Sequence, residues 1–386
     1  MTRTYQICSR CIMDTTDPDI QFDDQGICNH CRTYDRWAKQ HLAQAQARQT
    51  LLSQLVEEIK SAGSGKKYDC IIGVSGGVDS TYVAYLVKQL GLRPLAVHLD
   101  NGWDSELAVS NVEKTLKKLG IDLYTHVLDW EEFKELQIAF LRASTPDAEI
   151  PTDHAIEAVM YRAAARNGLR HIISGVNFAT EGVLPLKWAY GGKDWKYIQS
   201  VHKMFGQGKL KDYPHFSLRD LANFTVIRKM QFIRLLDYVP YSRDEALGIL
   251  VNELGWQYYG GKHSESIYTR FFQGYILPVK FNIDKRKAHL SSLVCSGQMT
   301  REQALKELAT NPYTEEMQKE DREYAIKKLA LSEEEFTRIM SLPVKSFLDY
   351  PTHYRQLEEI KRVVRKLRRF GFSPIKPYFI RQDSQE

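Results

Sequence analysis

The sequence has no long hydrophobic run and no strong excess of one charge. None of its 386 residues lies in a stretch that approaches the roughly 18 consecutive apolar residues of a membrane span. The segment that follows Met1 has no apolar core of the kind found in signal peptides. The formal net charge of +5 is mild, so it permits an anionic substrate but does not indicate a nucleic-acid binder. We therefore expect a soluble, cytoplasmic protein with neither a membrane nor a nucleic acid as partner.

Cysteine is also scarce, yet four of the six cysteines form two C-x-x-C pairs with sixteen residues between them: Cys8, Cys11, Cys28 and Cys31. In a chain without an export signal this spacing favours a metal over disulfides. Four thiolates satisfy tetrahedral Zn²⁺, and a site closed in this way folds a small ribbon without doing chemistry. An iron–sulfur cluster is the alternative occupant. Of the other two cysteines, Cys70 falls inside an expected strand and Cys295 has no partner base nearby in sequence.

After residue 67, short apolar runs alternate with helical patterns. Most of the helices end at a glycine, and the last expected helix of this region begins at Ser242 and Glu245 as an N-cap pair. The expected strands are 68–74, 95–99, 123–128, 171–174 and 232–239, and the expected helices are 78–90, 105–119, 131–143, 152–167 and 242–255. The alternation predicts an α/β fold, a doubly wound parallel five-stranded sheet whose ligand lies beyond the C-terminal ends of the strands.

The most specific motif joins the first expected strand to the helix after it, and consists of Ser75, Gly76, Gly77, Val78, Asp79 and Ser80. Two glycines allow a sharp turn that brings backbone N–H groups close to an anion. The helix start adds its dipole and its free N–H groups. Asp79 would repel a phosphate unless Mg²⁺ lay between them. The alternative interpretation is a strand-to-helix turn that merely contains two glycines.

This hexapeptide resembles the SGGxDS loop of the ATP pyrophosphatase superfamily, whose HUP-type, PP-loop fold binds the outer phosphates of ATP and releases AMP and pyrophosphate. The turn after the second strand resembles the superfamily turn that approaches the nucleoside of ATP. The segment after the fourth strand resembles the stretch of NAD synthetase whose glutamate binds Mg²⁺ together with the loop aspartate. The resemblance implies further ATP contacts at Asp100, Gly102, Gly175 and Asn177, and Mg²⁺ on Asp79 and Glu181. Taken alone, Glu181 fits a solvated loop carboxylate equally well.

Basic residues interleaved with aromatic ones follow this region, as suits an anionic small molecule or a nucleic acid. We interpret Lys262, His263 and Arg286 as catalytic candidates and Arg270, Lys285 and Lys287 as substrate ligands, although each lysine alone fits a solvated surface. Asp153 and His154 open an expected helix and form a candidate acid–base pair for the substrate, with a plain helix cap at Asp153 as the alternative.

The chain divides by composition into four expected regions. They are a four-cysteine ribbon over 1–35, a helix and linker over 36–66, the phosphate-loop domain over 67–255, and a mostly helical region for substrate or partners over 256–386. Within the last region, Thr300 with Gln303 and Ser332 with Glu335 are expected to begin helices.

Several longer sequence strings restrict the resemblance to one family within the superfamily. The cysteine pairs, the phosphate loop, and the strings PTDHAI (151–156), SGVN (174–177), GGKHSE (260–265) and KFNIDKRKAHLSSL (280–293) resemble the N-acetyl sugar amidotransferase family, WbpG-type, of lipopolysaccharide and O-antigen biosynthesis. The likeness runs from Cys8 to about Leu308. It implies ATP, Mg²⁺ and Zn²⁺ as cofactors and a UDP-linked acetamido sugar as substrate, whose acetamido group becomes an acetamidino group. It also implies a separate glutaminase similar to that of imidazole glycerol phosphate synthase, and a cyclase-like subunit that could channel ammonia.

Three other functions remain open at this stage, and one of them is a generic synthetase that acts on another carboxylate or amide. A tRNA thiolase of the same superfamily would need further cysteines, and only Cys70 and Cys295 are available. A zinc-ribbon module that binds nucleic acid through the basic C-terminal stretch would have no use for the phosphate loop and its aspartate.

Overall fold

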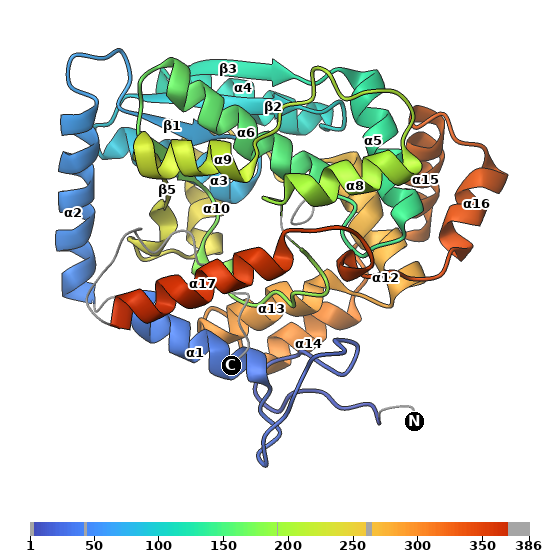
Figure 1. Ribbon diagram of the computed structural model, residues 1–386. Coiled ribbons are helices and arrows are strands. Elements are labelled where there is room, and N and C mark those ends of the chain that lie inside the picture. Colours follow the sequence, from blue (N-terminus) through green and yellow to red (C-terminus); the bar gives the residue numbers. More distant parts are fainter. Residues whose placement is uncertain (1–3, 42–44, 191, 260–264, 370–386) are drawn as a thin grey trace.

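The computed structural model describes residues 4–41, 45–190, 192–259 and 265–369 (Figure 1). A parallel sheet of five strands lies at its centre, in the order β3-β2-β1-β4-β5. The strands are β1 (Cys70–Gly73), β2 (Pro94–Asp100), β3 (Asp122–Val127), β4 (His171–Ser174) and β5 (Gln231–Arg234). The chain winds from β1 outward to β3, then crosses back to β4 and continues to β5 on the other side. The predicted doubly wound fold is confirmed, and its topological switch point lies between β1 and β4.

Helices cover both faces of the sheet, and the buried side chains of β1 point alternately to one face and to the other. Ile72 belongs to one core and Ile71 to the other. The first core contains residues of α2 (Ala45–Ala62), α3 (Val78–Gln89), α4 (Glu106–Leu119) and α10 (Arg243–Leu254). The second contains residues of α6 (Ile150–Arg166) and α9 (Leu218–Ala222), and a π-helical turn, Asn223–Ile227, follows α9.

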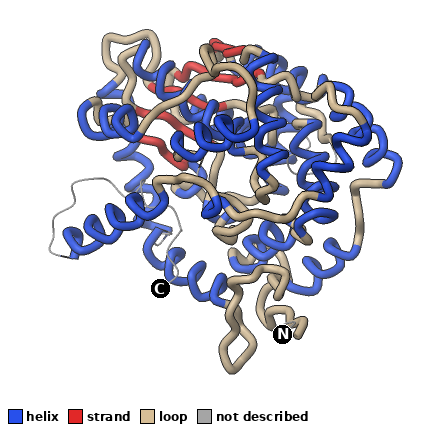
Figure 2. Tube along the Cα trace, turned by 45° about the vertical axis from the view of Figure 1, so that its right-hand side comes forward, coloured by secondary structure: helices blue, strands red, loops and turns tan. Residues whose placement is uncertain are grey.

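The remaining helices form a third layer, which Figure 2 shows beside and below the strands. A third core joins this layer to the cysteine ribbon, so that Cys8, Phe140 and Phe271 belong to one apolar cluster. Its helices are α1 (Asn29–His41), α5 (Trp130–Ala143), α7 (Phe178–Glu181), α8 (Trp195–Phe205), α11 (Ile267–Phe271), α12 (Leu277–Phe281), α13 (Lys285–Cys295), α14 (Arg301–Ala309), α15 (Glu315–Lys328), α16 (Glu333–Ser341) and α17 (Tyr354–Arg369). Short turns of helix lie at Leu235–Asp237, Phe272–Ile276 and Phe347–Asp349.

Side-chain caps begin the helices as the sequence predicts. Thr300 and Ser332 form reciprocal capping boxes with Gln303 and Glu335. At α10 the Ser242 hydroxyl accepts a hydrogen bond from the Glu245 N–H. Among the described residues, no helix is both long and apolar enough to cross a membrane.

Two expected elements differ from the structure. The fifth strand was expected over 232–239, but β5 ends at Arg234 and the chain turns into a short helix, where the Asp237 carboxylate accepts from the Phe178 N–H. A single helix was expected over 36–62, whereas α1 begins at Asn29, inside the second cysteine pair, and α2 begins at Ala45. The proposed boundary at residue 35 therefore falls within a helix.

Candidate active site

A cavity of about 2040 Å³ opens at the C-terminal edge of the sheet. Residues that directly follow three strands line it: Val74 after β1, Asn101 after β2 and Gly175 after β4. Pockets for one small ligand usually measure roughly 300–1,000 Å³, so this cavity has room for a nucleotide and a second substrate. Its position is the one that the winding of the sheet dictates.

The Ser75–Ser80 segment, here called the phosphate loop, forms one end of the cavity. Gly76 has a φ of 81°, and a side chain there would lie 2.7 Å from the Ala108 carbonyl oxygen. The Ser80 hydroxyl accepts a hydrogen bond from the Ser75 N–H at 3.2 Å and lies 3.1 Å from the Ser75 hydroxyl. Gly77 begins α3 without a side-chain cap, which leaves the first-turn N–H groups of that helix available to an anion.

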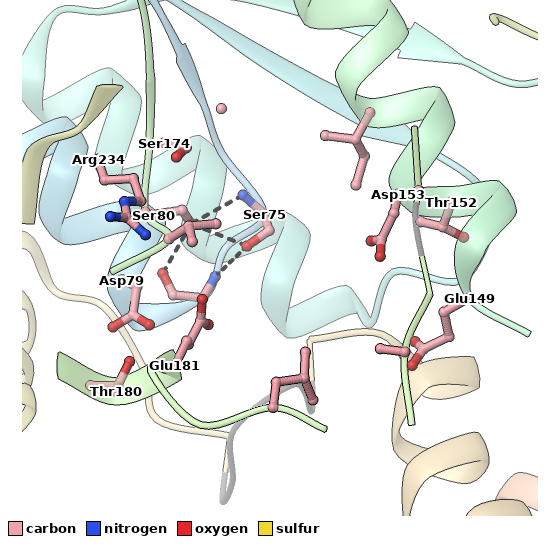
Figure 3. A pocket seen from close by; sticks show the side chains of 18 of the residues that line it. Ser75, Asp79, Ser80, Glu149, Thr152, Asp153, Ser174, Thr180, Glu181 and Arg234 are labelled. Atoms are coloured by element: carbon pink, nitrogen blue, oxygen red, sulfur yellow. Dashed lines mark hydrogen bonds between the residues drawn. The ribbon is translucent and has the colours of Figure 1, made fainter. Parts of the chain in front are cut away.

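Two carboxylates stand at the same end. Asp79 lies in the first turn of α3 and Glu181 ends α7, and Figure 3 shows both on the side of the cavity that holds Ser75 and Ser80. The Tyr241 hydroxyl donates a hydrogen bond to Asp79. Burial and the negative charge of Asp79 raise the pKa of Tyr241, so this donor stays protonated. Two carboxylates beside a phosphate cradle fit the oxygen preference of Mg²⁺.

Further residues at this end had no signal in the sequence beyond their place after a strand or in a polar stretch. Glu265 and Tyr259 approach Gly77, whose added Cβ would lie 3.1 Å from the Glu265 carboxylate and 3.3 Å from the Tyr259 hydroxyl. Arg234 is the last residue of β5 and pairs with Asp237 at 2.8 Å. Positively and negatively charged side chains therefore both lie around the phosphate loop.

A histidine couples the second strand to the loop. His98 lies 2.9 Å from the Val74 carbonyl oxygen through Nδ1 and 3.0 Å from the Asp104 carboxylate through Nε2. Burial disfavours the charged ring, but the hydrogen bond and charge of Asp104 outweigh it and raise the pKa of His98. No sequence pattern distinguishes His98, because it resembles any other residue of a buried strand.

The four other residues predicted to contact ATP fix the backbone of the turns that follow the strands. Gly175 approaches α3 so closely that an added Cβ would lie 2.7 Å from the Ser80 nitrogen. Asn177 is buried and caps α7 by accepting from the Thr180 N–H at 2.9 Å. Asp100 accepts from the Gly102 N–H at 2.8 Å, and neither residue lines the cavity, whereas Asn101 between them does.

The predicted substrate residues and the predicted catalytic residue Arg286 divide into two groups, and the first group lines the cavity. Asp153, Arg270, Lys285 and Arg286 belong to it. Arg270 makes a bidentate pair with Asp321, both distances being 2.7 Å. Arg286 pairs with its neighbour Asp284 at 2.7 Å. These two guanidinium groups are already held in place by carboxylates at the cavity wall.

The second group, His154 and Lys287, does not line the cavity. His154 is fully buried in an aromatic stack against Phe216, its Nδ1 lies 2.7 Å from the Gly192 carbonyl oxygen, and its Nε2 accepts from the Phe216 N–H. Burial lowers the pKa of His154 to about 4, so it is a neutral core residue here. Lys287 points away, to Asp14 of the ribbon, at 2.5 Å. The predicted catalytic residues Lys262 and His263 lie outside the described residues.

The four predicted zinc ligands come together. The Sγ atoms of Cys8, Cys11, Cys28 and Cys31 are all buried and lie within 4.8 Å of one another. The N–H groups of Cys11 and Cys28 point at the Cys8 sulfur at 3.4 and 3.3 Å, which stabilises a thiolate. This donor set fits zinc in a closed site. Cys295 lies outside the cluster, 3.7 Å from the Cys31 sulfur, while Cys70 is buried in β1.

Comparison with known proteins gives relatives for both parts of the chain. Residues 265–368 match the family model described as LPS biosynthesis protein WbpG-like, C-terminal domain. The chain is 24% identical to the uncharacterized protein MJ1599 of Methanocaldococcus jannaschii over 83% of its own length and 99% of the relative. It is 44% identical to the glutamine-hydrolyzing GMP synthase of Pyrobaculum aerophilum over 19% of its length and 14% of that enzyme. With the tRNA-specific 2-thiouridylase MnmA of Hahella chejuensis, 28% identity extends over 46% of this chain and 52% of the relative.

The last two relatives are therefore matched over about half of their length or less. The loop and the relatives together support an ATP-using enzyme of the ATP pyrophosphatase superfamily. The resemblance recognised from the sequence is confirmed: residues 265–368 match the WbpG-like C-terminal domain, and the chain is similar to enzymes of the ATP pyrophosphatase superfamily.

Proposed function

We propose that the protein is an ATP-dependent, AMP-forming amidotransferase that converts the acetamido group of a nucleotide-linked N-acetyl sugar into an acetamidino group. The observation that supports it most is the position of the phosphate loop, with Asp79 and Glu181, at one end of a cavity large enough for two substrates. The WbpG-like match over residues 265–368 supports the choice of a sugar in lipopolysaccharide or O-antigen synthesis.

The chemistry explains the need for ATP. An amide carbon is a poor electrophile, so ammonia cannot displace its oxygen directly. In the proposed first step the acetamido oxygen attacks the α-phosphorus of ATP, and the bond to pyrophosphate breaks. The phosphate loop would hold the departing pyrophosphate with backbone N–H groups and two hydroxyls. Magnesium, which Asp79 and Glu181 would hold, supplies positive charge to these phosphates.

In the proposed second step ammonia forms a C–N bond to the activated carbon. The C–O bond to the adenylate then breaks, AMP leaves with the electron pair, and the product keeps the delocalised charge of an amidinium. Lys262, His263 and Arg286 remain proposed charge-balancing groups, and Arg270 and Lys285 remain proposed ligands of the sugar nucleotide. Arg286 and Arg270 line the cavity, as this role requires.

The proposed source of ammonia is a separate glutaminase similar to that of imidazole glycerol phosphate synthase, with a cyclase-like subunit as a possible channel. Free ammonium should replace the glutaminase in vitro, because the adenylated intermediate reacts with ammonia and not with glutamine.

A tRNA thiolase is the second candidate, and the MnmA similarity favours it. Sulfur transfer of that kind would require a thiol within reach of the activated base. Cys70 is buried in β1, Cys295 lies beside the ribbon, and neither lines the cavity. This placement supports nitrogen transfer over sulfur transfer.

The test combines ATP, Mg²⁺, ammonium and a panel of UDP-linked acetamido sugars with the purified chain, followed by mass spectrometry. We expect AMP together with a sugar whose mass has changed by the replacement of one oxygen by NH. ADP as product, or AMP formation that depends on tRNA and not on an acetamido sugar, would contradict the proposal.

A further inference from the structure

The segment that joins β4 to α7, residues 174–181, packs against the phosphate loop. A Cβ added to Gly175 would lie 2.7 Å from the Ser80 nitrogen and 2.9 Å from the Asp79 carbonyl carbon. Ser174, Thr180 and Glu181 of this segment line the cavity, and Figure 3 shows them on the side that holds Ser80 and Asp79. The segment therefore forms a second wall at the phosphate-loop end.

Thr180 brings a buried hydroxyl to this wall. The residue is 1% exposed and lines the cavity, and Figure 3 shows its side chain directed toward Asp79. In the described part of the chain, the Thr180 Oγ1 has no hydrogen-bond partner. A buried hydroxyl without a partner is costly, because it has given up its bonds to water and gained none in return. A ligand at the phosphate loop would remove that cost.

The backbone of Thr180 is held from both sides. Its N–H donates to the Asn177 side chain at 2.9 Å, and its carbonyl oxygen lies 3.1 Å from the His289 Nδ1. A helical threonine can satisfy its hydroxyl on a preceding carbonyl, as Thr225 does on the Leu221 carbonyl at 2.7 Å. Thr180 makes no bond of that kind. Its hydroxyl is therefore fixed in the cavity wall and remains available to a ligand.

Ser174 adds a second hydroxyl to the same wall. It is the last residue of β4, and its backbone is paired with Arg234 of β5. Its Oγ is buried and, among the described residues, also has no hydrogen-bond partner. The Ser75 and Ser80 hydroxyls of the phosphate loop lie 3.1 Å apart at this end of the cavity. Four hydroxyl groups from two separate segments therefore line the phosphate-loop end.

We propose that the Thr180 hydroxyl, with Ser174 as a second donor, binds the pyrophosphate part of ATP from the wall that β4 and α7 form. The inference deepens the proposed function and rests on its use of ATP. Phosphate oxygens are strong acceptors, and a hydrogen bond to a charged acceptor is about twice as strong as a neutral one. A hydroxyl is itself neutral, so it adds a donor without changing the charge around Asp79 and Glu181.

The missing partner also predicts how stability should respond. Valine has the shape of threonine without the hydroxyl, and no described protein group bonds to the Thr180 hydroxyl. Thr180→Val should therefore leave the free energy of unfolding unchanged or raise it, because a buried polar group without a partner is removed. A loss of phosphate affinity without a loss of stability separates a binding role from a structural one.

The test measures the binding of pyrophosphate, ATP and AMP, each with Mg²⁺, to the purified chain by calorimetry. We expect Thr180→Val to weaken the binding of pyrophosphate and of ATP about tenfold or more, because a hydrogen bond to a charged group is lost. Binding of AMP should not change. Thr180→Ser keeps the hydroxyl and should bind all three ligands nearly as wild type does, and Ser174→Ala should cause a smaller loss than Thr180→Val.

Thr115→Val is the matched control. Thr115 lies in α4, is 2% exposed, and its hydroxyl also has no hydrogen-bond partner among the described residues. Unlike Thr180, it does not line the cavity. The same substitution in the same kind of surroundings should therefore leave the affinities for pyrophosphate, ATP and AMP at their wild-type values.

Several results would overturn the inference. Wild-type affinity for pyrophosphate in Thr180→Val would do so, and so would an equal loss for pyrophosphate and AMP. A loss that excess Mg²⁺ restores would assign the hydroxyl to the metal ion instead. If Thr180→Val does not fold, wild-type pyrophosphate affinity in Ser174→Ala would overturn the inference.

The proposed function can fail separately from this inference. A chain that binds pyrophosphate through Thr180 but forms no amidine would contradict the proposed sugar chemistry and leave the inference standing. Amidine formation by variants that bind pyrophosphate as wild type does would sink the inference alone. A wild-type chain that binds neither ATP nor pyrophosphate would sink both.

Discussion

The two ends of the cavity differ in the protein groups that can bind a charged ligand. At the phosphate loop the binding groups are backbone N–H groups and hydroxyls of one continuous segment, Ser75–Ser80, fixed by glycine and by the start of α3. At the other end, here called the carboxylate end, Asp147, Glu149 and Asp153 line the cavity. The binding groups there are side chains drawn from 147–153, 273 and 285, far apart in the chain. One end suits an anion, and the other holds carboxylates around the ammonium group of Lys285.

Under the proposed function, a defect at the phosphate loop should prevent adenylation, whereas a defect at the carboxylate end should act on the second substrate. We expect the ribbon to take part in no chemical step, because its four cysteine sulfurs are buried and lie around one another. Variants in the three places should therefore give three different patterns.

The largest effect on activity is expected from substitution of Asp79, the carboxylate of the phosphate loop. Asp79→Ala removes a proposed magnesium ligand and the acceptor of the Tyr241 hydroxyl. We expect AMP formation to fall by at least about a thousandfold, as for the loss of a group that stabilises transition-state charge. AMP is measured by chromatography, and zinc content by emission spectroscopy should be unchanged. Zinc loss equal to the activity loss would instead indicate unfolding, and AMP formation at the wild-type rate would remove Asp79 from the mechanism.

A steric change can test how rigidly the loop is held. Gly175→Ala would place a Cβ 2.7 Å from the Ser80 nitrogen and 2.9 Å from the Asp79 carbonyl carbon. We expect a loss of about 1–3 kcal/mol in the free energy of unfolding and a higher KM for ATP, because the first turn of α3 must move. Gly248→Ala in α10 is the matched control, since its Cβ would meet nothing within 4 Å. It should stabilise the protein by up to about 1 kcal/mol, and equal effects of the two substitutions would contradict the tight fit at Gly175.

The phosphate-loop end could be predicted from sequence because its determinants are local. A short apolar strand, two glycines and an amphipathic helix follow one another without interruption, so the loop, the five-stranded sheet and most helix boundaries were correct. The same holds for the four cysteines, whose spacing alone brings them together. Capping pairs such as Thr300 with Gln303 also act within one turn.

The carboxylate end and the roles of neighbouring residues could not be predicted, because packing decides them. Lys285 and Lys287 are two residues apart on α13, yet one faces the cavity and the other pairs with Asp14. His154 follows Asp153 directly, but the helix turns its ring into an aromatic stack. Asp147 gave no pattern at all, because its place in the cavity wall beside Glu149 and Asp153 exists only in the folded chain.

The neighbouring lysines give the next prediction. Lys287→Ala leaves Asp14, whose side chain is fully buried, without its cation. We expect a loss of about 2 kcal/mol in the free energy of unfolding, with kcat and the KM for ammonium unchanged. Lys285→Ala should alter kinetics as well as stability, because Lys285 lines the cavity and also pairs with Glu149. Denaturant unfolding and steady-state kinetics on both variants check this contrast, and a kinetic defect in Lys287→Ala would mean that the ribbon communicates with the cavity.

The smallest effect concerns the histidine behind the phosphate loop. The Asp104 carboxylate, acting against burial, raises the pKa of His98. A raised folded-state pKa adds stability that is fully present below the ordinary histidine value of about 6.5 and is lost as the pH rises through the folded value. Asp104→Asn should therefore cost of the order of 1 kcal/mol at pH 6 and less at pH 9. Melting temperatures across this range check the sign, with His98→Gln as the control that should erase the pH dependence of the difference. If Asp104→Asn costs more at pH 9 than at pH 6, the pair does not hold a charged imidazole.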